Sequence, residues 1–272
     1  MTGPDVVPIL LYHSVCDDPP PALQRWTTPP ARFREHLEFF AGEGYQTLTV
    51  SAYVARLRSG SPLVGRVAVV TFDDGYADFA DEALPALVDT ATACTLYLST
   101  AYMGATSSWL GRDGEHPMLS WDAAAKVAAA GVEIGAHAHR HVALDELAPR
   151  DARTEIVRSK DEIEQRLGRP VESFAYPHGY HGPKVKAIVR DAGFANACGV
   201  KNALSGPGDD EYGLARVMLE GDVSTTQLRA LLADLGRAPA RERLDTTLWR
   251  MYRRTRARVR PHTHRTTTVS AP

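Results

Sequence analysis

The stretch VVTFDDGY, residues 69–76, decides how this chain folds and where its chemistry lies. Its first half is typical of a buried strand, yet the run ends in two carboxylates, Asp73 and Asp74, followed by Gly75. Burying charge beside an apolar strand costs free energy unless the charge is paired or binds a metal ion. We therefore expect a divalent metal ion to satisfy one aspartate and catalysis to use the other.

Outward from this stretch, short apolar runs alternate with helical patterns, as in strand–helix–strand units. Strands are predicted at residues 8–12, 67–72, 94–98, 132–135, 171–176, 194–199 and 214–219. Helices are predicted at about residues 32–43, 79–88, 121–130, 150–167 and 184–192, and after a capping box that begins at Ser224. Residues 101–119 predict a long loop, and Pro85 predicts a kink or restart in the second helix.

Periodicity alone does not separate two α/β folds with a parallel sheet, the barrel and the open doubly wound sheet, but the position of the polar residues helps. Asp73, Asp74, His137 and Pro177 all fall just after predicted strands. A (β/α) barrel builds its site at the carboxyl ends of its strands. We therefore predict an α/β fold made of a single (β/α) barrel.

The composition fits one globular domain. With 272 residues, 44% of them hydrophobic, the chain is long enough to bury a substantial core. A formal net charge of −2 gives no argument for nucleic-acid binding. Three cysteines at wide spacing, Cys16, Cys94 and Cys198, fit packed, reduced thiols and neither a disulfide framework nor a zinc–cysteine site.

The charge pattern changes near the C-terminus. No acidic residue follows Asp245, whereas seven arginines do, so we predict a catalytic domain at residues 1–240 and a basic helix or tail at residues 241–272. Residues 248–260 fit both a basic amphipathic helix on anionic lipid head groups and a solvated extension. The first residues lack the pattern of a secretory signal, so we expect a cytoplasmic protein, with peripheral membrane contact through the tail as an option.

A second motif, GAHAHRH at residues 135–141, directly follows a predicted strand. His137 and His141 are four residues apart, so in a helical turn both imidazoles would face one side, as in metal-binding pairs. Alone, an exposed or structural pair explains this pattern equally well. Together with one aspartate, the pair would form a site with open positions that suits Zn²⁺, and also Co²⁺, Ni²⁺ or Fe²⁺. His139 is expected to point elsewhere.

A third motif, FAYPHG at residues 174–179, is a strand that breaks at a turn, where a backbone N–H can face an oxyanion. In this order, TFDDG, the histidine pair and FAYPHG resemble the three leading motifs of the polysaccharide deacetylase family, also called NodB-homology or carbohydrate esterase family 4. LYHSV at residues 11–15 is similar to the start of a branch that resembles poly-N-acetylglucosamine deacetylases. The resemblance covers about residues 7–220 and implies a distorted seven-stranded barrel.

The resemblance also implies a role for each matching residue. Asp73 matches the catalytic base, and Asp74, His137 and His141 match the metal ligands. His178 stands where the family usually has tyrosine, whose backbone N–H helps to hold the oxyanion, so the side-chain change need not abolish that function.

Two further assignments are less direct. His13 matches the general acid of the branch with the Tyr-His-x-Val start, and no Leu-x-His motif occurs at residues 214–222, although a structural histidine is the alternative. Many members carry an arginine two residues before the motif proline, where this chain has Ala175. We hypothesise that Arg216 supplies that charge, the alternative being an ordinary surface arginine.

Taken together, the resemblance implies a metal-dependent hydrolase that removes an N-acetyl group from an N-acetylhexosamine-containing glycan, a lipid-linked sugar or a glycosylated small molecule. An amidase or deformylase acting on a formamido-sugar or a non-sugar amide is the alternative. A non-catalytic glycan-binding protein is disfavoured, because it would have no reason to keep a costly charged site. Four aromatic residues near the motifs fit either sugar stacking or core packing: Tyr76, Trp109, Trp121 and Tyr180.

Overall fold

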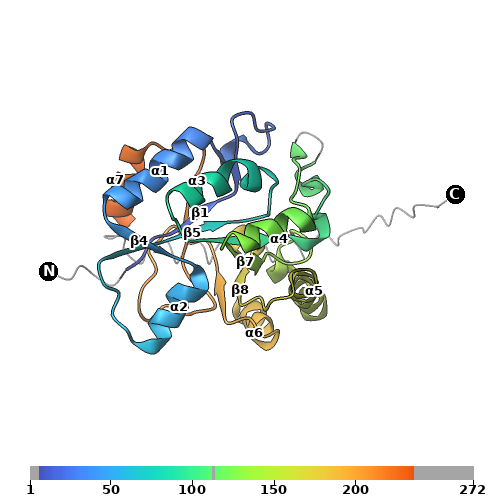
Figure 1. The fold of residues 1–272 in the computed structure, drawn as a ribbon. Helices are drawn as coiled ribbons and strands as arrows, with labels where there is room; N and C mark the ends of the chain where they lie inside the picture. The colour runs from blue at the N-terminus through green and yellow to red at the C-terminus, as the bar shows by residue number, and fades with distance from the viewer. Residues whose placement is uncertain (1–5, 112–113, 236–272) are drawn as a thin grey trace. The chain divides into compact units, whose positions relative to one another are not determined.

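The computed structural model describes residues 6–111 and 114–235 (Figure 1). The predicted basic tail at residues 241–272, its proposed membrane contact and the last residues of the predicted domain lie outside the described residues. Within the described part of the chain, no helix combines the length and hydrophobicity needed to span a lipid bilayer.

A parallel sheet of eight strands forms the centre of the fold, in the order β10-β1-β5-β6-β7-β8-β9 with β4 also paired to β5. The strands are β1 (Ile9–Tyr12), β4 (Tyr45–Leu48), β5 (Arg66–Phe72), β6 (Cys94–Leu98), β7 (Glu133–Ala136), β8 (Ser173–Ala175), β9 (Asn196–Cys198) and β10 (Val217–Met218). A separate pair consists of β2 (Ser14–Val15) and β3 (Thr27–Thr28).

The segment that leads into β10 brings the two ends of the sheet together. Leu214 forms a parallel bridge with Cys198 of β9, and its backbone N–H donates to the carbonyl oxygen of Ala197 at 3.0 Å. A few residues later, Val217 pairs with Leu10 of β1. One segment therefore contacts β9 at one end of the sheet and β1 near the other, which confirms the predicted distorted barrel of seven strands. The additional strand, β4, pairs with the first half of β5.

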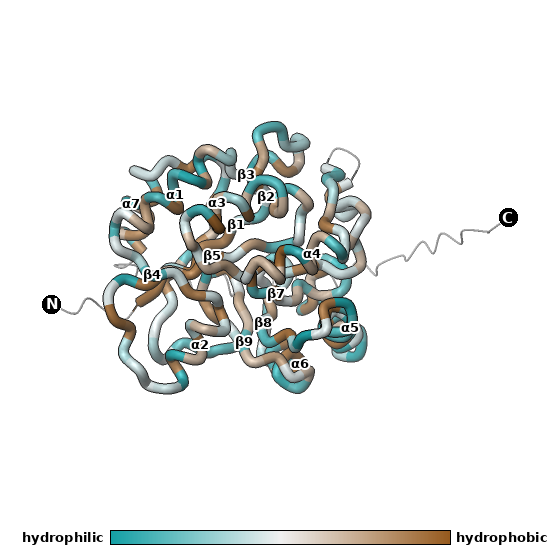
Figure 2. The backbone as a smooth tube through the Cα atoms, viewed as in Figure 1, coloured by the Kyte–Doolittle hydropathy of each residue, from teal (hydrophilic) through white to brown (hydrophobic). Residues whose placement is uncertain are grey.

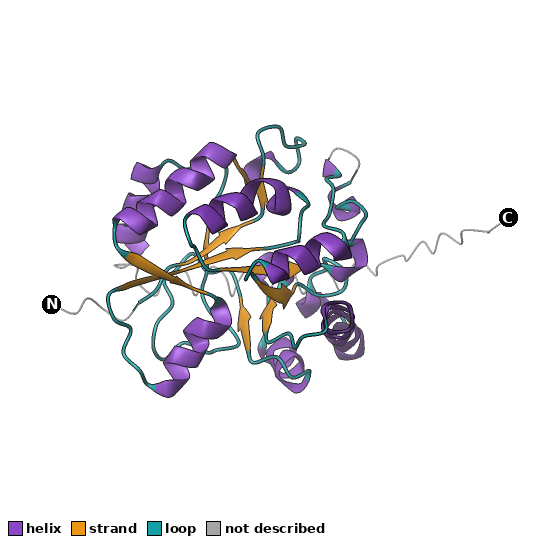
Figure 3. Ribbon diagram, viewed as in Figure 1, coloured by secondary structure: helices purple, strands orange, loops and turns teal. Residues whose placement is uncertain are grey.

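Helices surround the strands (Figure 3). They are α1 (Pro30–Gly42), α2 (Val50–Ser59), α3 (Leu84–Asp89), α4 (Trp121–Ala129), α5 (Pro149–Leu167), α6 (Pro183–Asp191) and α7 (Thr225–Leu235). Short 3₁₀ turns occur at Gln24–Trp26, Thr100–Tyr102, Ser108–Leu110, Leu144–Glu146 and Pro177–Gly179. The sequence predictions missed the strands β2, β3 and β4 and the helix α2.

Local signals explain where several helices begin. Ser120 caps α4 by accepting a hydrogen bond from the backbone N–H of Ala123, and Ser224 and Gln227 form the predicted capping box of α7. The restart predicted at Pro85 is also present, because a π-helical turn at Phe79–Ala83 precedes α3.

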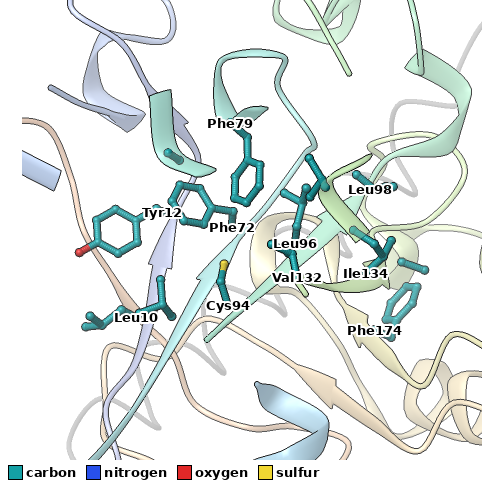
Figure 4. Close-up of a cluster of buried hydrophobic side chains, with 14 of the residues drawn as sticks. Leu10, Tyr12, Phe72, Phe79, Cys94, Leu96, Leu98, Val132, Ile134 and Phe174 are labelled. Carbon is teal, nitrogen blue, oxygen red and sulfur yellow. The ribbon is translucent and has the colours of Figure 1, made fainter. Parts of the chain in front are cut away.

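Two hydrophobic clusters cover the two faces of the sheet. The larger one packs between strands and helices, where Tyr12 stacks on Phe72 at 5.3 Å and Phe72 meets Phe79 edge-on at 4.9 Å (Figure 4). The smaller one contains alternate residues of the strands and Tyr53 of α2. Figure 2 shows the hydrophobic residues gathered along the central strands, with hydrophilic residues along outer helices such as α5.

The cysteines agree with the prediction of packed thiols at two of three positions. Cys94 lies in the larger cluster and Cys198 in the smaller one, and both are buried and free. Cys16 is free and only half-buried, so packing alone does not account for it.

Candidate active site

Asp73 points into the barrel because it continues the inward series of β5. Val67 and Val69 belong to the smaller hydrophobic cluster, which lies inside the barrel and is called the inner cluster below, whereas Val70 and Phe72 belong to the larger cluster against the helices. Side chains alternate along a strand, so the next inward position after residues 67, 69 and 71 is Asp73. The carboxylate is therefore buried inside the barrel, with 3% of the residue exposed.

The same alternation directs two histidines inward. Ile9 of β1 lies in the inner cluster, and His13 continues its series one residue beyond the strand. On β7, a Cβ on Gly135 would lie 2.4 Å from the ring of Tyr97, so this position also faces inward and is open only to glycine. His137 continues that series, which brings its side chain beside Asp73.

Asp74 reaches the same place by a turn in the backbone. An extended chain would send its side chain toward the helices, but Asp74 has φ +73° and Gly75 has φ +88°. A Cβ on Gly75 would lie 2.8 Å from the Leu98 side chain, so glycine both permits the turn and fits the space. As a result, Asp74 Oδ1 lies 3.4 Å from His137 Nε2.

Arg216 forms a two-pronged ion pair with Asp73. Its Nη1 and Nη2 donate to the two carboxylate oxygens at 2.6 and 2.7 Å, and its Nε donates to the Gly199 carbonyl oxygen at 3.0 Å. The guanidinium lies 5.6 Å from the centre of the Tyr97 ring and is fully buried. Arg216 is therefore not an ordinary surface arginine, and the residue just before β10, distant from Asp73 in the sequence, brings charge to the carboxylate.

This ion pair sets the ionisation of Asp73. Burial alone would raise the pKa of the carboxyl group, but the Arg216 guanidinium outweighs burial, and the His137 and His13 imidazoles add to its effect. The pKa of Asp73 is held at about 2. The group is consequently a carboxylate at neutral pH, as a proton acceptor must be.

His137 and His141 converge on Asp74 without the predicted helical turn. The backbone leaves β7 through Ala138 at φ +63°, and residues 137–141 form no helix. Both Nε2 atoms nevertheless lie close to Asp74 Oδ1, His137 at 3.4 Å and His141 at 3.3 Å. The helical-turn prediction was wrong because tertiary hydrogen bonds, rather than helical spacing, hold this loop.

Those hydrogen bonds come from α5. The backbone N–H of His139 donates to the Glu155 carbonyl oxygen, and the backbone N–H of Arg140 donates to the Glu155 carboxylate at 2.7 Å. His139 itself turns away, as expected, toward Thr100 and Glu162. Buried Glu155 therefore fixes the histidine loop, a role that no motif in the sequence indicates.

The three groups fit a divalent metal ion. His137 Nδ1 donates to the Ala175 carbonyl oxygen at 2.9 Å, which leaves the Nε2 lone pair directed at Asp74. Among the described residues, Asp74 Oδ1 and His141 Nδ1 are buried without a hydrogen-bond partner, and the three ligand atoms lie within 4.8 Å of one another. Burial lowers the pKa of His137 to about 4 and that of His141 well below its usual value, so both are neutral ligands at pH 7.

Two further histidines lie near this centre: His13 of the LYHSV motif and His178 of the FAYPHG motif. His13 is half-buried, and its Nδ1 has no hydrogen-bond partner within the described part of the chain. It lies beside Asp73, since the Asp73 backbone N–H donates to the Tyr12 carbonyl oxygen. His178 has φ +59° in the Pro177–Gly179 turn, and its exposed ring contacts that of His141 at 4.4 Å.

Some of the aromatic residues near the motifs contact the site histidines, and others pack in the core. Trp109 contacts the His141 ring at 5.1 Å, and Tyr180 lies 6.1 Å from the ring of His178. Tyr76 is 1% exposed and hydrogen-bonded to Asp74, so it is a core residue that orients a ligand. Trp121 packs against the core and Arg166. The sequence reasoning missed Trp26, whose ring lies 5.6 Å from that of His13.

Comparison with known proteins agrees with this geometry. The family model described as polysaccharide deacetylase matches residues 61–197, about half of the chain, and the chain therefore belongs to the polysaccharide deacetylase family. YxkH of Bacillus subtilis (strain 168), provisionally named a polysaccharide deacetylase, is 22% identical over 233 residues, which are 85% of this chain and 78% of that protein.

Solved structures share the fold. The Streptococcus pyogenes deacetylase PplD, in complex with acetate, has a TM-score of 0.73 at 21% identity, covering 84% of this chain and 99% of its own. IcaB from Ammonifex degensii has a TM-score of 0.70 at 22% identity, covering 86% and 98%. The fold is thus the NodB-like (β/α) barrel. The family makes the chain a hydrolase of the deacetylase class, whose members depend on a metal ion.

Acid is expected to destabilise the metal-free protein through the buried histidines. The pKa of His137 is about 4 in the folded state against 6.5 as the ordinary value, and that of His141 is lowered too. Between these values the unfolded state binds more protons, so stability is complete above pH 6.5 and is lost as the pH falls toward 4. His137 alone would contribute roughly 3 kcal/mol to this loss.

Urea unfolding of the metal-free protein across this pH range measures the effect. A His137→Gln variant is the matched control, since it removes the group that titrates and should show a shallower dependence on pH. A free energy of unfolding that is the same at both ends of the range would contradict this expectation.

Proposed function

We propose that this chain is a metal-dependent N-deacetylase that releases acetate from an N-acetylhexosamine unit of a glycan, a lipid-linked sugar or a glycosylated small molecule. The proposal rests on the different surroundings of the two adjacent aspartates, Asp73 and Asp74. Asp73 is kept ionised by buried Arg216, whereas Asp74 lies between two neutral histidines with an oxygen that has no hydrogen-bond partner among the described residues. One carboxylate is prepared to accept a proton and the other to bind a cation.

Asp74, His137 and His141 are the residues that would hold the metal, with Zn²⁺ as the first expectation and Co²⁺, Ni²⁺ or Fe²⁺ also compatible with the ligand set. When bound, such an ion would polarise the amide carbonyl group and make a water molecule a stronger nucleophile at neutral pH. Tyr76 orients the Asp74 carboxylate by hydrogen bonding, and the Ala175 carbonyl oxygen orients the His137 ring.

Asp73 acts as the general base. Its carboxylate takes a proton from the attacking water, while Arg216 holds both carboxylate oxygens and fixes their direction. The His178 backbone N–H donates to the oxyanion that develops on the carbonyl oxygen. His13 donates a proton to the departing nitrogen as the carbon–nitrogen bond breaks. The products are acetate and a free amino sugar.

The aromatic rings around the site support a sugar as the substrate. Trp26 lies beside His13 and Trp109 beside His141, so the two indole rings belong to different loops next to the catalytic groups. Flat rings that combine an apolar face with a polar edge suit the faces of a pyranose. Tyr180 adds a third ring near His178.

A release assay on a small panel tests the substrate class. Metal-loaded protein is incubated with N-acetylglucosamine oligomers, UDP-N-acetylhexosamines, lipid-linked sugars, formamido-sugars and simple acetanilides, and acetate and formate are quantified. We expect acetate from at least one N-acetylated sugar. Formate alone, or acetate from the non-sugar amides alone, would instead support the amidase or deformylase alternative and overturn the proposal.

The Asp74→Asn substitution is expected to remove one equivalent of bound metal per chain. Turnover should fall by roughly 10³-fold, since a Lewis acid contributes several kcal/mol to such a reaction. Metal analysis of the dialysed protein and an acetate-release assay measure the two effects. Asp89→Asn is the matched control, because Asp89 is an exposed partner of Arg34. An Asp74→Asn protein with wild-type metal content would show that Asp74 is not a ligand.

A further inference from the structure

A second group of potential ligands lies outside the Asp74, His137 and His141 set. The Cys16 thiol, the Asp78 carboxylate and the His116 imidazole bring one ligand atom each to within 4.8 Å of one another. Cys16 follows β2, Asp78 precedes the π-helical turn, and His116 belongs to the loop before α4. The three residues are far apart in the sequence, so the fold alone assembles the group.

The contacts within this group leave one oxygen unsatisfied. His116 Nε2 lies 2.9 Å from Asp78 Oδ2, and the Ser14 hydroxyl donates to the same oxygen while lying 3.7 Å from Cys16 Sγ. The Asp78 side chain is 8% exposed, and its other oxygen, Oδ1, is buried without a hydrogen-bond partner among the described residues. A buried carboxylate oxygen without a partner costs free energy, and a bound cation would remove that cost.

We propose that Cys16, Asp78 and His116 bind a second divalent metal ion. A thiolate, an imidazole and a carboxylate together suit Zn²⁺ or Co²⁺, whereas Mg²⁺ and Ca²⁺ prefer oxygen ligands. In the metal-free protein, protons occupy the thiol and the hydrogen bond between His116 and Asp78. The metal takes the place of these protons, which pass to solvent on binding.

The position of this site suggests what the ion does. Cys16 lies three residues after His13, Asp78 four residues after Asp74, and His116 in the same loop as Trp109. An ion held by all three residues would link three segments of the site: the one with the proposed general acid His13, the one with Asp73 and Asp74, and the one with Trp109. Any effect of this cross-link on turnover rests on the proposed function, whereas metal binding itself does not.

Cobalt titration tests the site because, of the two ligand sets among the described residues, this one contains sulfur. Metal-free wild-type protein titrated with Co²⁺ should develop a thiolate-to-cobalt charge-transfer band in the near ultraviolet. The band should persist in Asp74→Asn, which lacks the other site, and should be lost in Cys16→Ser. Cys94→Ala is the matched control and should keep the band, since Cys94 is buried in the larger hydrophobic cluster.

Zinc content gives an independent readout. The wild-type protein should bind two equivalents, while Cys16→Ser, His116→Gln and Asp74→Asn should each bind one. A wild-type protein with one equivalent and no charge-transfer band would overturn the inference, as would a band that survives in Cys16→Ser. Neither readout uses substrate, so a protein that shows the band and two equivalents but releases no acetate would refute the proposed function and leave the second site standing.

Discussion

An Asp73→Asn variant should lose about 10³-fold or more in turnover on an N-acetylated sugar, while keeping its bound metal. Asparagine has nearly the shape of aspartate but cannot accept the proton of the attacking water, and a positioned general base contributes about 10²–10⁴-fold. The expected loss lies in the upper part of that range because the attacking nucleophile is water itself. Steady-state acetate release and metal analysis of the same preparation measure the two effects.

The same substitution should also destabilise the fold, since it leaves the Arg216 charge buried without its partner. Removing one member of a buried ion pair costs about 3–5 kcal/mol. The double variant Asp73→Asn/Arg216→Met removes both charges and should recover much of this stability without recovering turnover. If Asp73→Asn retained wild-type turnover, or if the double variant were active, the role of Asp73 as the base would be wrong.

Replacing Arg216 with methionine should move the acid limb of the pH–rate profile to higher pH. In the wild-type protein the pKa of Asp73 is about 2, so Asp73 stays ionised over the whole range in which activity is measured. Once the guanidinium is gone, burial raises this pKa against the effect of the His137 and His13 imidazoles alone. A neighbouring arginine lowers the pKa of an aspartate by about 1–3 units, and the limb should move upward by a similar amount.

The measurement is kcat/KM against pH for wild type, Arg216→Met and Arg216→Lys. Lysine keeps the charge but cannot bind both oxygens, so it should restore the ionisation of Asp73 more fully than the turnover. Arg153→Ala, at an exposed ion pair with Asp191, is the matched control and should behave as wild type. An unchanged profile and unchanged turnover in Arg216→Met would remove Arg216 from the mechanism.

Local patterns explain how much of the fold the sequence could predict. The run at residues 67–72 and the capping box at Ser224 carry their own signals, and both elements are present. The segment Tyr45–Leu48 has no such signal, because it is a short strand that only partly faces the core. Its pairing with the first half of β5, and not its composition, makes it a strand.

The sequence likewise indicated some residues of the site and gave no sign of how others are placed. The order of the motifs and the resemblance drew attention to Asp74 and His141, but the helical turn predicted for the histidines was wrong because Glu155, on the following helix α5, shapes their loop. The resemblance also showed that an arginine was missing at Ala175. That Arg216 is buried against Asp73 depends on barrel closure, which no local pattern describes.

The sequence could not predict side-chain clusters whose members are brought together only by the fold. Trp26 lies next to His13 only because β2 and β3 pair, and nothing in its neighbourhood marks it as part of a site. Cys16, Asp78 and His116 likewise have no spacing typical of a metal site, so their proximity appears only in three dimensions.

The most direct test of the central claim is a stoichiometric measurement of acetate and new amine groups released by the metal-loaded protein from N-acetylated sugars. We expect equal amounts of both products from the wild-type protein on at least one sugar of the panel, and only background release from Asp73→Asn with the same metal content. Wild-type protein with full metal occupancy that releases neither product from any N-acetylated sugar would contradict this claim, as would release by Asp73→Asn at the wild-type rate.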